Sequence, residues 1–554
     1  MQTAPSDPAA TPSGETFWSS LTERKRVSLS LLPSFLVGLL FIWRARGVAP
    51  DGSVRWVLFD DAMISMSYAR TFAQTGELVW FPGADRVEGI TNPLWTLYMA
   101  LLHAVGLSGN AVVLAVSFTG LVCVLAAGWL AYRIARHLTD VAALWVASAV
   151  AVSLTYSLMY WSVRGMEVGA VTVAVLAAVL LAVRFAESVN RRALVGLCVV
   201  AAAGVLLRFD FAVVPAVITV WLFFCLRGVR HRLLYCAAPV LVGVAAAGAV
   251  VATRILYYGE AFPNTYTLKM AGVTVGDRLA RGFDANWKLV GFLLVVAVGV
   301  AAITVFRRSL FTNHRAVWLL TGVLAIMVAY SVYVGGDAWE FFPNRYVTPG
   351  IATGSIVAIV GVGGLLGRAA GRVGVAAAFA VAVVLFTSSA GGYYQWAATG
   401  GLYVYADHSV ANWATTLRDG GIADSDTVIA VTTAGASQYY SELPAVDVLG
   451  KSDPVVARTH PKKSFLPGHD RWDIAHTILT LKPDIVTNLP FTTEAEWDAI
   501  RADYSPYCLD YNGPTETETK EVLVLRGSPH VDVGRLRECE VRRPQVATGW
   551  YLKP

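Results

Sequence analysis

The stretch "LFDDAMISMSYAR" (58–70) places two adjacent carboxylates, Asp60 and Asp61, directly after a short apolar segment. The small and apolar residues that follow recur at helical spacing: Ala62, Met63, Met66, Ala69 and Ala73. This pattern predicts a helix in the membrane interface that begins with the acidic pair. An acidic residue at a helix start is commonly a cap for free backbone N–H groups, so the pair alone does not establish a functional site.

The composition around this stretch is that of a membrane protein. Of 554 residues, 55% are hydrophobic and only 15% are charged, and the mean hydropathy is +0.54. Soluble domains carry about 25% charged residues. The net charge of +5 does not indicate a nucleic-acid partner, because the basic residues are scattered in short clusters along the chain.

Long apolar segments predict eleven membrane spans. They lie at about 28–43, 110–132, 141–160, 168–186, 193–207, 211–226, 233–256, 288–306, 316–334, 350–367 and 373–390. The apolar stretch 93–107 is short for a span and predicts a second helix in the interface. Residues 1–27 are polar and are expected to be disordered on the cytoplasmic side. The membrane domain is therefore predicted to cover 28–392.

Clusters of Lys and Arg near the span ends predict the orientation. They occur at 22–26, 133–137, 184–192, 227–232, 307–315 and 368–372. With eleven spans, all six clusters fall on one side of the membrane, which the positive-inside rule makes the cytoplasmic side. The N-terminus is then cytoplasmic and the C-terminus lies outside.

Polar motifs gather at the opposite ends of the spans. They are "DD" (60–61), "WFPGADRVEGITNPLW" (80–95), "RGME" (164–167), "RFD" (208–210), "YYGEAFPNTYTLK" (257–269) and "GGDAWEFFPNR" (335–345). Each motif alone is compatible with a solvated loop. Polar residues at the edge of a membrane are costly and commonly functional, so six such loops on one face predict a functional cavity there.

These motifs resemble those of the GT-C glycosyltransferases, which use polyprenyl-phosphate sugars at the outer face of the membrane. In detail they are most similar to the actinobacterial terminal β-(1→2) arabinofuranosyltransferases, from about residue 55 to about 350 and again in "YYSELPAVDVLGKSDPVVAR" (439–458). The resemblance implies a polytopic α-helical GT-C fold in the plasma membrane. It also implies decaprenyl-phosphoryl-arabinofuranose as the donor and the non-reducing ends of cell-wall arabinan as the acceptor.

Transfer of a sugar from a lipid phosphate requires a group that deprotonates the acceptor hydroxyl and positive charges that hold the departing phosphate. Adjacent helix positions point about 100° apart, so one aspartate of the pair is expected to face the sugar and the other to cap or orient. Asp60 is favoured as the base. If donor and product are both β-linked, configuration is retained, and either an enzyme nucleophile intervenes or attack and departure share one face.

For the phosphate, Lys269 and Arg345 are the preferred cations, with Arg208 as a further candidate that can instead pair with Asp210. Snorkelling toward lipid headgroups is the structural alternative for these side chains. Six residues with carboxylate, hydroxyl or amide groups are predicted to bind the sugar or the acceptor: Glu88, Thr91, Asn92, Glu167, Asn264 and Asp337. No cofactor is expected, although a divalent cation at Asp60 and Asp61 is conceivable.

Beyond residue 392 the composition becomes ordinary and predicts an extracytoplasmic α/β domain over 393–554. The segments 426–435, 444–450 and 483–488 have the pattern of short buried strands, and 405–421 and 491–504 that of amphipathic helices. Cys508 and Cys539 are the only cysteines in this domain, and an oxidising compartment permits their pairing.

Two alternatives to an arabinofuranosyltransferase stay open. One is a related transferase that moves another sugar, such as mannose. The other is a non-catalytic membrane protein that transports or assembles polyprenyl-linked glycans. Transporters commonly contain internal repeats and broken helices in mid-membrane, whereas the polar residues here gather at one face, which favours an enzyme.

Overall fold

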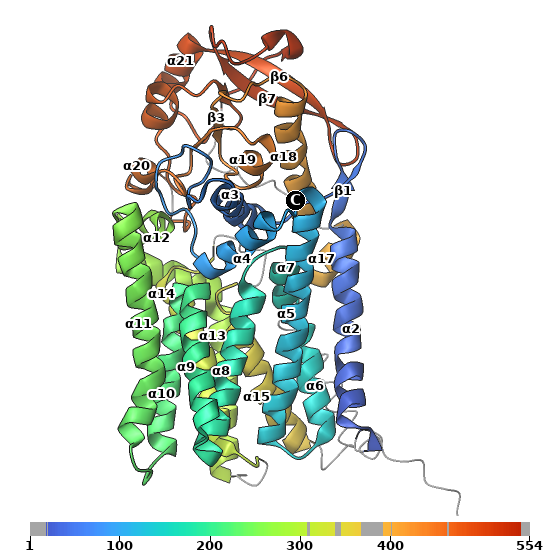
Figure 1. The fold of residues 1–554 in the computed structure, drawn as a ribbon, viewed down its shortest axis with the longest axis vertical. Coiled ribbons are helices and arrows are strands. Elements are labelled where there is room, and N and C mark those ends of the chain that lie inside the picture. Colours follow the sequence, from blue (N-terminus) through green and yellow to red (C-terminus); the bar gives the residue numbers. More distant parts are fainter. Residues whose placement is uncertain are drawn as a thin grey trace, which may run out of the picture.

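The computed structural model of the protein describes residues 18, 20–306, 311–337, 345–366, 392–399, 402–462 and 465–543. A long bundle of helices forms one end of the molecule and a mixed α/β domain the other, with α3 and α4 between them (Figure 1). The chain passes from the bundle to the α/β domain near residue 400, so the α/β domain is C-terminal, as the sequence predicts.

The bundle consists of long apolar helices that run side by side (Figure 1). Its helices are α2 (Glu23–Arg44), α5 (Gly109–Leu138), α6 (Ala142–Ser153), α7 (Tyr156–Val163), α8 (Val168–Ser188), α9 (Arg191–Leu207), α10 (Val213–Cys225), α11 (Arg232–Tyr258), α13 (Val275–Phe306), α14 (His314–Tyr333) and α15 (Thr348–Leu366). The short helices α12 (Asn264–Met270) and α17 (Gly392–Thr399) follow α11 and precede the C-terminal domain.

Within the described residues, six helices are long and apolar enough to cross a membrane, or seven if α6 and α7, which meet at a bend of 48°, form one span. Two shorter apolar helices lie at Phe209–Cys225 and Thr348–Gly361. Every predicted apolar segment from 28 to 367 coincides with a helix of the bundle. The eleventh, 373–390, lies outside the described residues. The prediction of helical segments is therefore confirmed over this range, while fewer of them than expected have the full length of a span.

The basic clusters meet at the end of the bundle that is remote from the C-terminal domain (Figure 1). Arg136 at the end of α5 pairs with Glu23 at the start of α2, at 2.5 Å. The next residue, His137, contacts Glu187 of α8, which also accepts a hydrogen bond from Asn313 before α14. This arrangement agrees with the predicted grouping of the clusters. Residues 307–310 and 368–372 lie outside the described part of the chain.

Helices α3 (Asp60–Thr75) and α4 (Pro93–Ala104) form the layer between the two domains (Figure 1). Both predicted helices are confirmed, and α3 begins with the acidic pair. The predicted apolar face of α3 is largely buried in the main core, through Ala62, Met63, Met66 and Ala69. A short antiparallel hairpin of β1 (Arg46–Val48) and β2 (Val54–Trp56) precedes α3. The face that the sequence assigns to the membrane surface therefore packs mainly against protein.

The C-terminal domain is built on a six-stranded mixed sheet in the order β4-β3-β5-β7-β6-β8. Its first half is parallel and consists of β3 (Ile429–Val431), β4 (Ala445–Asp447) and β5 (Ile485–Val486). Its second half is antiparallel and consists of β6 (Tyr504–Asn512), β7 (Thr517–Leu525) and β8 (Arg537–Glu538). The helices are α18 (Leu402–Asp419), α19 (Ala436–Ser441), α20 (Pro454–Ala457) and α21 (Glu494–Asp503). A disulfide joins Cys508 to Cys539, with a Cα–Cα distance of 5.7 Å, so the predicted pairing is confirmed.

Buried polar contacts attach this domain to the layer beneath it. Arg164, at the end of α7, forms an ion pair with Asp407 of α18. His408 of the same helix contacts the carbonyl oxygen of Ala45 through Nε2, at 2.9 Å. The side chains of Arg164, Asp407 and His408 are buried and make these contacts between the C-terminal domain and the rest of the chain. The domains therefore form one structural unit around α3 and α4.

Candidate functional site

A polar cavity of about 70 Å³ lies where the start of α3, the loop before α4, helix α12 and two loops of the C-terminal domain meet. It is lined by Asp61, Ile64, Ser65, Gly89, Ile90, Thr91, Asn92, Met166, Arg208, Thr265, Leu268, Lys269, Asp337, Arg345, Tyr346, Lys451, Pro467, Gly468 and His469. All six predicted polar motifs supply at least one lining residue. The sequence prediction that these loops converge is therefore confirmed by the fold.

Of the two adjacent aspartates, Asp61 lines the cavity and Asp60 does not. Asp61 Oδ1 accepts a hydrogen bond from Lys451 Nζ at 2.6 Å, and Asp61 Oδ2 accepts one from Arg345 at 2.9 Å. Arg345 in turn lies 3.1 Å from Asp337. Two carboxylates and two cations thus alternate along one wall of the cavity.

The electrostatics of this wall hold Asp61 in its ionised form. Burial by itself would raise the pKa of Asp61, but the charges of Lys451 and Arg345 outweigh it and hold the pKa well below its usual range. The reverse holds for Lys451, where burial disfavours the charge and Asp61 and Asp60 raise the pKa above its usual value. For His469, burial and the Lys451 charge lower the pKa to about 3, so the imidazole is neutral at physiological pH.

Asp60 has a different position from the one predicted. Its Oδ1 accepts hydrogen bonds from the backbone N–H groups of Gly435, at 3.2 Å, and Ala436, at 2.8 Å, where α19 begins. An ideal Cβ on Gly435 would lie 1.9 Å from the carbonyl oxygen of Asp60, so only glycine fits this approach. The pair divides its roles as the sequence implied, but with the residues exchanged: Asp60 caps a helix of the C-terminal domain, and Asp61 faces the cavity.

Lys269 brings a positive charge to the cavity from the last turn of α12. Its Nζ lies 3.1 Å from the hydroxyl group of Tyr346, and no carboxylate in the described part of the chain is within ion-pair distance of it. The Tyr346 ring also lies beneath Arg208 and Arg345, at 5.1 and 5.6 Å. Burial would raise the pKa of Tyr346, but Lys269 and Arg345 lower it overall. Lys269 is therefore the cation of the cavity most available to an incoming anion.

Arg208 lines the cavity but has two acidic partners. It pairs with Glu167 at 2.6 Å and with Asp210 at 2.7 Å, so the predicted contact with Asp210 is confirmed. Glu167 also accepts a hydrogen bond from Asn92 at 2.8 Å. Of these, Arg208 and Asn92 border the cavity, whereas Glu167 is fully buried behind them. The network fixes the loop before α4 against the end of α9.

Two further predicted sugar-binding residues stabilise the fold. Glu88 forms a buried ion pair with Arg254 of α11, at 2.6 Å, and does not line the cavity. Asn264 donates hydrogen bonds to the carbonyl oxygens of Gly450, Lys451 and Asp453 at the start of α20. Both were predicted as ligands because carboxylate and amide groups suit sugar hydroxyls, and the sequence does not reveal their distant partners. Asn264 still acts on the site, because it holds the loop that carries Lys451. Thr91 and Asp337 line the cavity as predicted.

Sequence reasoning missed the contribution of the C-terminal domain. Lys451, on the loop after β4, and His469, on the loop before Ile474, both border the cavity. The segment "VLGKSDPVVAR", which contains Lys451, resembles the arabinofuranosyltransferases, but the resemblance did not indicate that Lys451 borders the site. A lysine after a short buried strand is a weak signal by itself, because its partner Asp61 lies 390 positions away.

The geometry of the acidic pair does not form a shared set of metal ligands. Asp60 faces backbone N–H groups, and both oxygens of Asp61 face cations. A divalent cation at Asp61 would have to displace Lys451 or Arg345. Across the described residues, no cluster of three or more His, Cys, Asp or Glu side chains has the arrangement of a metal site.

Comparisons with known proteins define the fold. Residues 400–524 match a family model described as a domain of unknown function, DUF8728, and no curated protein sequence matches the chain. Among solved structures, ArnT from Cupriavidus metallidurans bound to undecaprenyl phosphate is similar, with a TM-score of 0.55 and 12% identity over 92% of this chain and 99% of that one. The chain has the GT-C fold.

Two structures of the oligosaccharyltransferase from Archaeoglobus fulgidus are similar in the same way. The apo form has a TM-score of 0.51 and 11% identity over 78% of this chain and 65% of that one. The complex with an inhibitory peptide and a dolichol-phosphate has a TM-score of 0.50 and 11% identity over 88% and 74%. At such identities the likeness concerns the fold alone. Together with the apolar helices, it establishes a multi-pass membrane protein.

Proposed function

We propose that the protein is a polyprenyl-phosphate-dependent glycosyltransferase and that the cavity at Asp61 is its active site. The observation that carries the proposal is the contact of the Asp61 carboxylate with Lys451 and Arg345, in a small cavity that Lys269 also lines without a carboxylate partner among the described residues. Similar folds that were solved with undecaprenyl phosphate and a dolichol-phosphate support the choice of donor class.

The proposed reaction breaks the bond between the anomeric carbon and the phosphate oxygen of the donor and forms a bond to an acceptor hydroxyl. The phosphate leaves with the prenyl chain and gains negative charge as the bond breaks. Lys269, with Arg345 and Arg208 nearby, supplies positive charge to this group. A stabilisation that grows as charge develops acts on the transition state more than on the bound donor.

Asp61 is the carboxylate we assign to the reacting sugar. It is ionised over the physiological range, because Lys451 and Arg345 hold its pKa low. When the donor phosphate enters, Arg345 gains an anionic partner in addition to Asp61 and Asp337, which weakens its hold on Asp61. Asp61 can then accept the proton of the acceptor hydroxyl or attack the anomeric carbon. Attack by Asp61 followed by attack of the acceptor would retain configuration through two displacements, whereas Asp61 as the base would require attack and departure on one face.

The finer assignment is arabinofuranosyl transfer from decaprenyl-phosphoryl-arabinofuranose to the non-reducing ends of cell-wall arabinan, with terminal β-(1→2) linkages. It is supported by the resemblance of the motifs at 59–70, 80–95, 257–269 and 439–458 to those of the arabinofuranosyltransferases. The proposed site lies outside the cytoplasm, on the face where the C-terminal domain covers the bundle. A mannosyl or other polyprenyl-linked donor is the alternative within the same reaction class.

The experiment is an assay of the purified full-length protein with synthetic polyprenyl-phosphoryl sugars and short arabinosides. Decaprenyl-phosphoryl arabinofuranose and a mannosyl donor are compared, and the product linkage is determined by NMR. The matched control is Asp473→Asn, a carboxylate of the C-terminal domain that does not line the cavity. Transfer from the arabinosyl donor alone supports the full proposal, and transfer from the mannosyl donor alone supports only the reaction class. If a folded protein transfers neither sugar, the proposal is rejected.

A further inference from the structure

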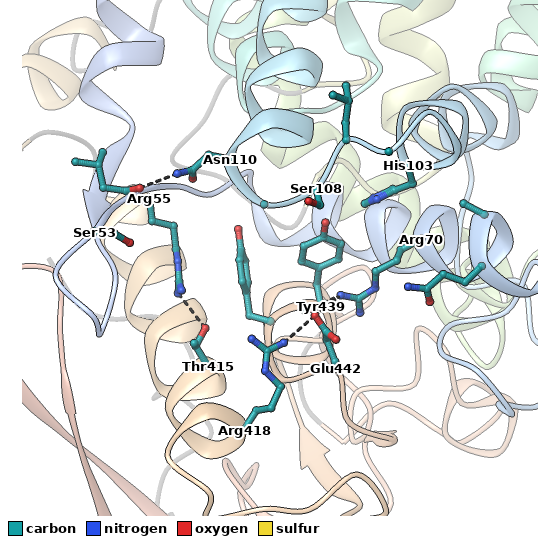
Figure 2. A pocket seen from close by; sticks show the side chains of 17 residues that line it. Ser53, Arg55, Arg70, His103, Ser108, Asn110, Thr415, Arg418, Tyr439 and Glu442 are labelled. Carbon is teal, nitrogen blue, oxygen red and sulfur yellow. Dashed lines mark hydrogen bonds and ion pairs between the residues drawn. The ribbon is translucent and has the colours of Figure 1, made fainter.

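A second and larger cavity, of about 550 Å³, lies at the other end of α3 (Figure 2). Its walls come from β2, the C-terminal half of α3, the turn between α4 and α5, and helices α18 and α19 of the C-terminal domain. It shares no lining residue with the cavity at Asp61. Arg70 follows Asp61 by nine positions on α3, which corresponds to roughly 14 Å along the helix axis. The proposed glycosyl transfer leaves this cavity without a role.

Three arginine side chains, Arg55, Arg70 and Arg418, point into this space from three different elements (Figure 2). The only acidic side chain that lines it in the described part of the chain is Glu442, which lies 2.7 Å from Arg418 and 3.4 Å from Arg70. One lining carboxylate therefore faces three guanidinium groups, and Asp419, beside the lining, also pairs with Arg418, at 2.7 Å. Two carboxylates thus lie against three arginines. The lining carries an excess of positive charge.

Arg55 is the guanidinium that no carboxylate compensates among the described residues. Its hydrogen bonds go to neutral groups of α18: the carbonyl oxygen of Ala411, the amide of Asn412 and the hydroxyl of Thr415, at 2.9 to 3.3 Å. These bonds hold the side chain in place beside the cavity. A fixed guanidinium whose partners are neutral is well suited to a planar or tetrahedral oxyanion.

One more feature of the wall favours an anion. The long helix α5 begins at this cavity, and its N-cap residue Ser108 makes no capping bond with its side chain. The start of a helix carries a partial positive charge. His103 on α4 also borders the cavity and has a buried Nε2 without a hydrogen-bond partner among the described residues, but burial and Arg70 lower its pKa to about 4, so the ring adds no charge at physiological pH.

The cavity lies at the start of a helix that is a candidate membrane span, a position that suits a lipid headgroup. Helix α5, which starts at it, is one of the helices long and apolar enough to cross a membrane. Helix α4, whose last turn borders it, exposes an apolar row along one side: Leu97 at 43%, Leu101 at 59% and Val105 at 65%. An exposed apolar row on a short helix at the end of a span is typical of contact with lipid in the interface.

We propose that this second cavity binds the phosphate group of a membrane lipid, with the guanidinium groups of Arg55 and Arg418 around the phosphate and the lipid chains toward α4. Its size and charge suit a phosphodiester headgroup such as that of phosphatidylglycerol. A lipid bound there would fasten the C-terminal domain to the membrane, because α18 and α19 supply one wall and α4 and α5 the other.

The test measures lipid retention by the full-length protein with native mass spectrometry, after exchange into mixed micelles that contain either phosphatidylglycerol or phosphatidylcholine. The wild type is expected to retain phosphatidylglycerol selectively. Arg418→Gln, which removes one half-exposed cation, is expected to weaken this binding about tenfold. Gln74→Glu, which adds a negative charge at an exposed lining position, is expected to weaken it without removing any existing contact. The control is Arg537→Gln, an exposed arginine of β8 that pairs with Asp510.

Several outcomes would overturn the proposal. Equal retention of the two lipids would remove the preference for an anion, and retention unchanged in both Arg418→Gln and Gln74→Glu would place the lipid elsewhere. If inorganic phosphate alone raises the melting temperature as much as phosphatidylglycerol does, the cavity binds an anion but not a lipid. Because none of these variants touches the cavity at Asp61, they test the lipid site independently of glycosyl transfer.

Discussion

Asp61 and Lys451 lie 390 positions apart in the chain, and their side chains meet at 2.6 Å. Asp61 stands in the first turn of α3, and Lys451 stands on the loop after β4, so the contact joins the layer above the bundle to the C-terminal domain. Neither domain alone contains the complete cavity. The C-terminal domain is therefore part of the proposed active site, and its Lys451 helps to keep the pKa of Asp61 low.

The first prediction concerns Lys451→Met. In the wild type, Lys451 and Arg345 hold the pKa of Asp61 below its usual value despite burial. Without Lys451, burial is opposed by Arg345 alone, so the pKa of Asp61 rises. Because the proposed mechanism uses ionised Asp61, the acid limb of the pH–rate profile moves to higher pH, and activity is lost more at pH 5 than at pH 8. Turnover measured across this range tests the shift.

The control for Lys451→Met is Lys482→Met, an exposed lysine of the same domain that pairs with Asp503. Its pH–rate profile should match that of the wild type. An unchanged acid limb in Lys451→Met, with measurable turnover, would mean that Asp61 does not titrate in the rate-limiting step.

The second prediction separates the two aspartates. Asp61→Asn should lower turnover by at least about a hundredfold in a protein that folds normally, because a positioned base or nucleophile is lost. Asp60→Ala removes the acceptor of two backbone N–H groups and should lower the free energy of unfolding by about 1.5–3 kcal/mol. Turnover and thermal unfolding are measured for each variant. The reverse result, with Asp60→Ala inactive but stable and Asp61→Asn active, would restore Asp60 as the base.

The third prediction concerns Lys269→Ala. If Lys269 holds the departing phosphate, its loss removes a charge-assisted contact of roughly 1.5–3 kcal/mol, or about ten- to a hundredfold in kcat/KM. Both kcat and the affinity for the donor should fall, because the contact strengthens as the phosphate gains charge. Steady-state kinetics with varied donor measure the two effects. Lys462→Ala, at an exposed position near the same loops, is the matched control. A change in KM alone would limit Lys269 to binding the donor.

Features of the fold that depend on local pattern could be predicted from the sequence. The apolar segments of the bundle, helix α3 with its acidic start and the three buried strands of the C-terminal domain follow from periodicity within a few residues. The disulfide followed from the presence of only two cysteines in that domain. The antiparallel strands β6 and β7 were not predicted. They carry alternating buried and exposed residues, including charged residues such as Glu518 and Lys520, and so lack the continuous apolar pattern of buried strands.

The candidate site could be predicted only in part, because its contacts join distant segments. Convergence of the polar loops followed from topology. The roles of single residues depend on partners that the sequence does not reveal: Glu88 meets Arg254 across 166 positions, and Asp60 meets Ala436 across 376. An angle of about 100° between neighbouring helix positions implied that the two aspartates would separate. The angle alone does not indicate which aspartate faces the cavity and which contacts the C-terminal domain at α19.

The fourth prediction concerns the disulfide of the C-terminal domain. The disulfide joins Cys508 to Cys539, which are separated by 31 positions in the sequence, and so closes a loop of that length. Closing a loop of this length lowers the entropy of the unfolded chain and stabilises the folded domain by about 3–4 kcal/mol. Cys508→Ser should therefore lower the unfolding temperature of the purified protein, and a reductant should have the same effect on the wild type. Cys198→Ser, in α9 of the bundle, should leave the temperature unchanged. Equal melting of all three proteins would show that the bridge contributes little.

The last prediction concerns the side of the membrane on which the proposed active site lies. The basic clusters gather at the end of the bundle opposite the C-terminal domain, so the positive-inside rule puts that domain and Asp61 outside the cytoplasm. A cysteine introduced at Lys482, an exposed position of the C-terminal domain, should react with a membrane-impermeant maleimide in intact cells. A cysteine at Arg230, an exposed position between α10 and α11, should react only after permeabilisation. Wild-type protein, whose described free cysteines lie within bundle helices, gives the background. The opposite labelling pattern would place the cavity in the cytoplasm, where a donor presented at the outer face could not reach it.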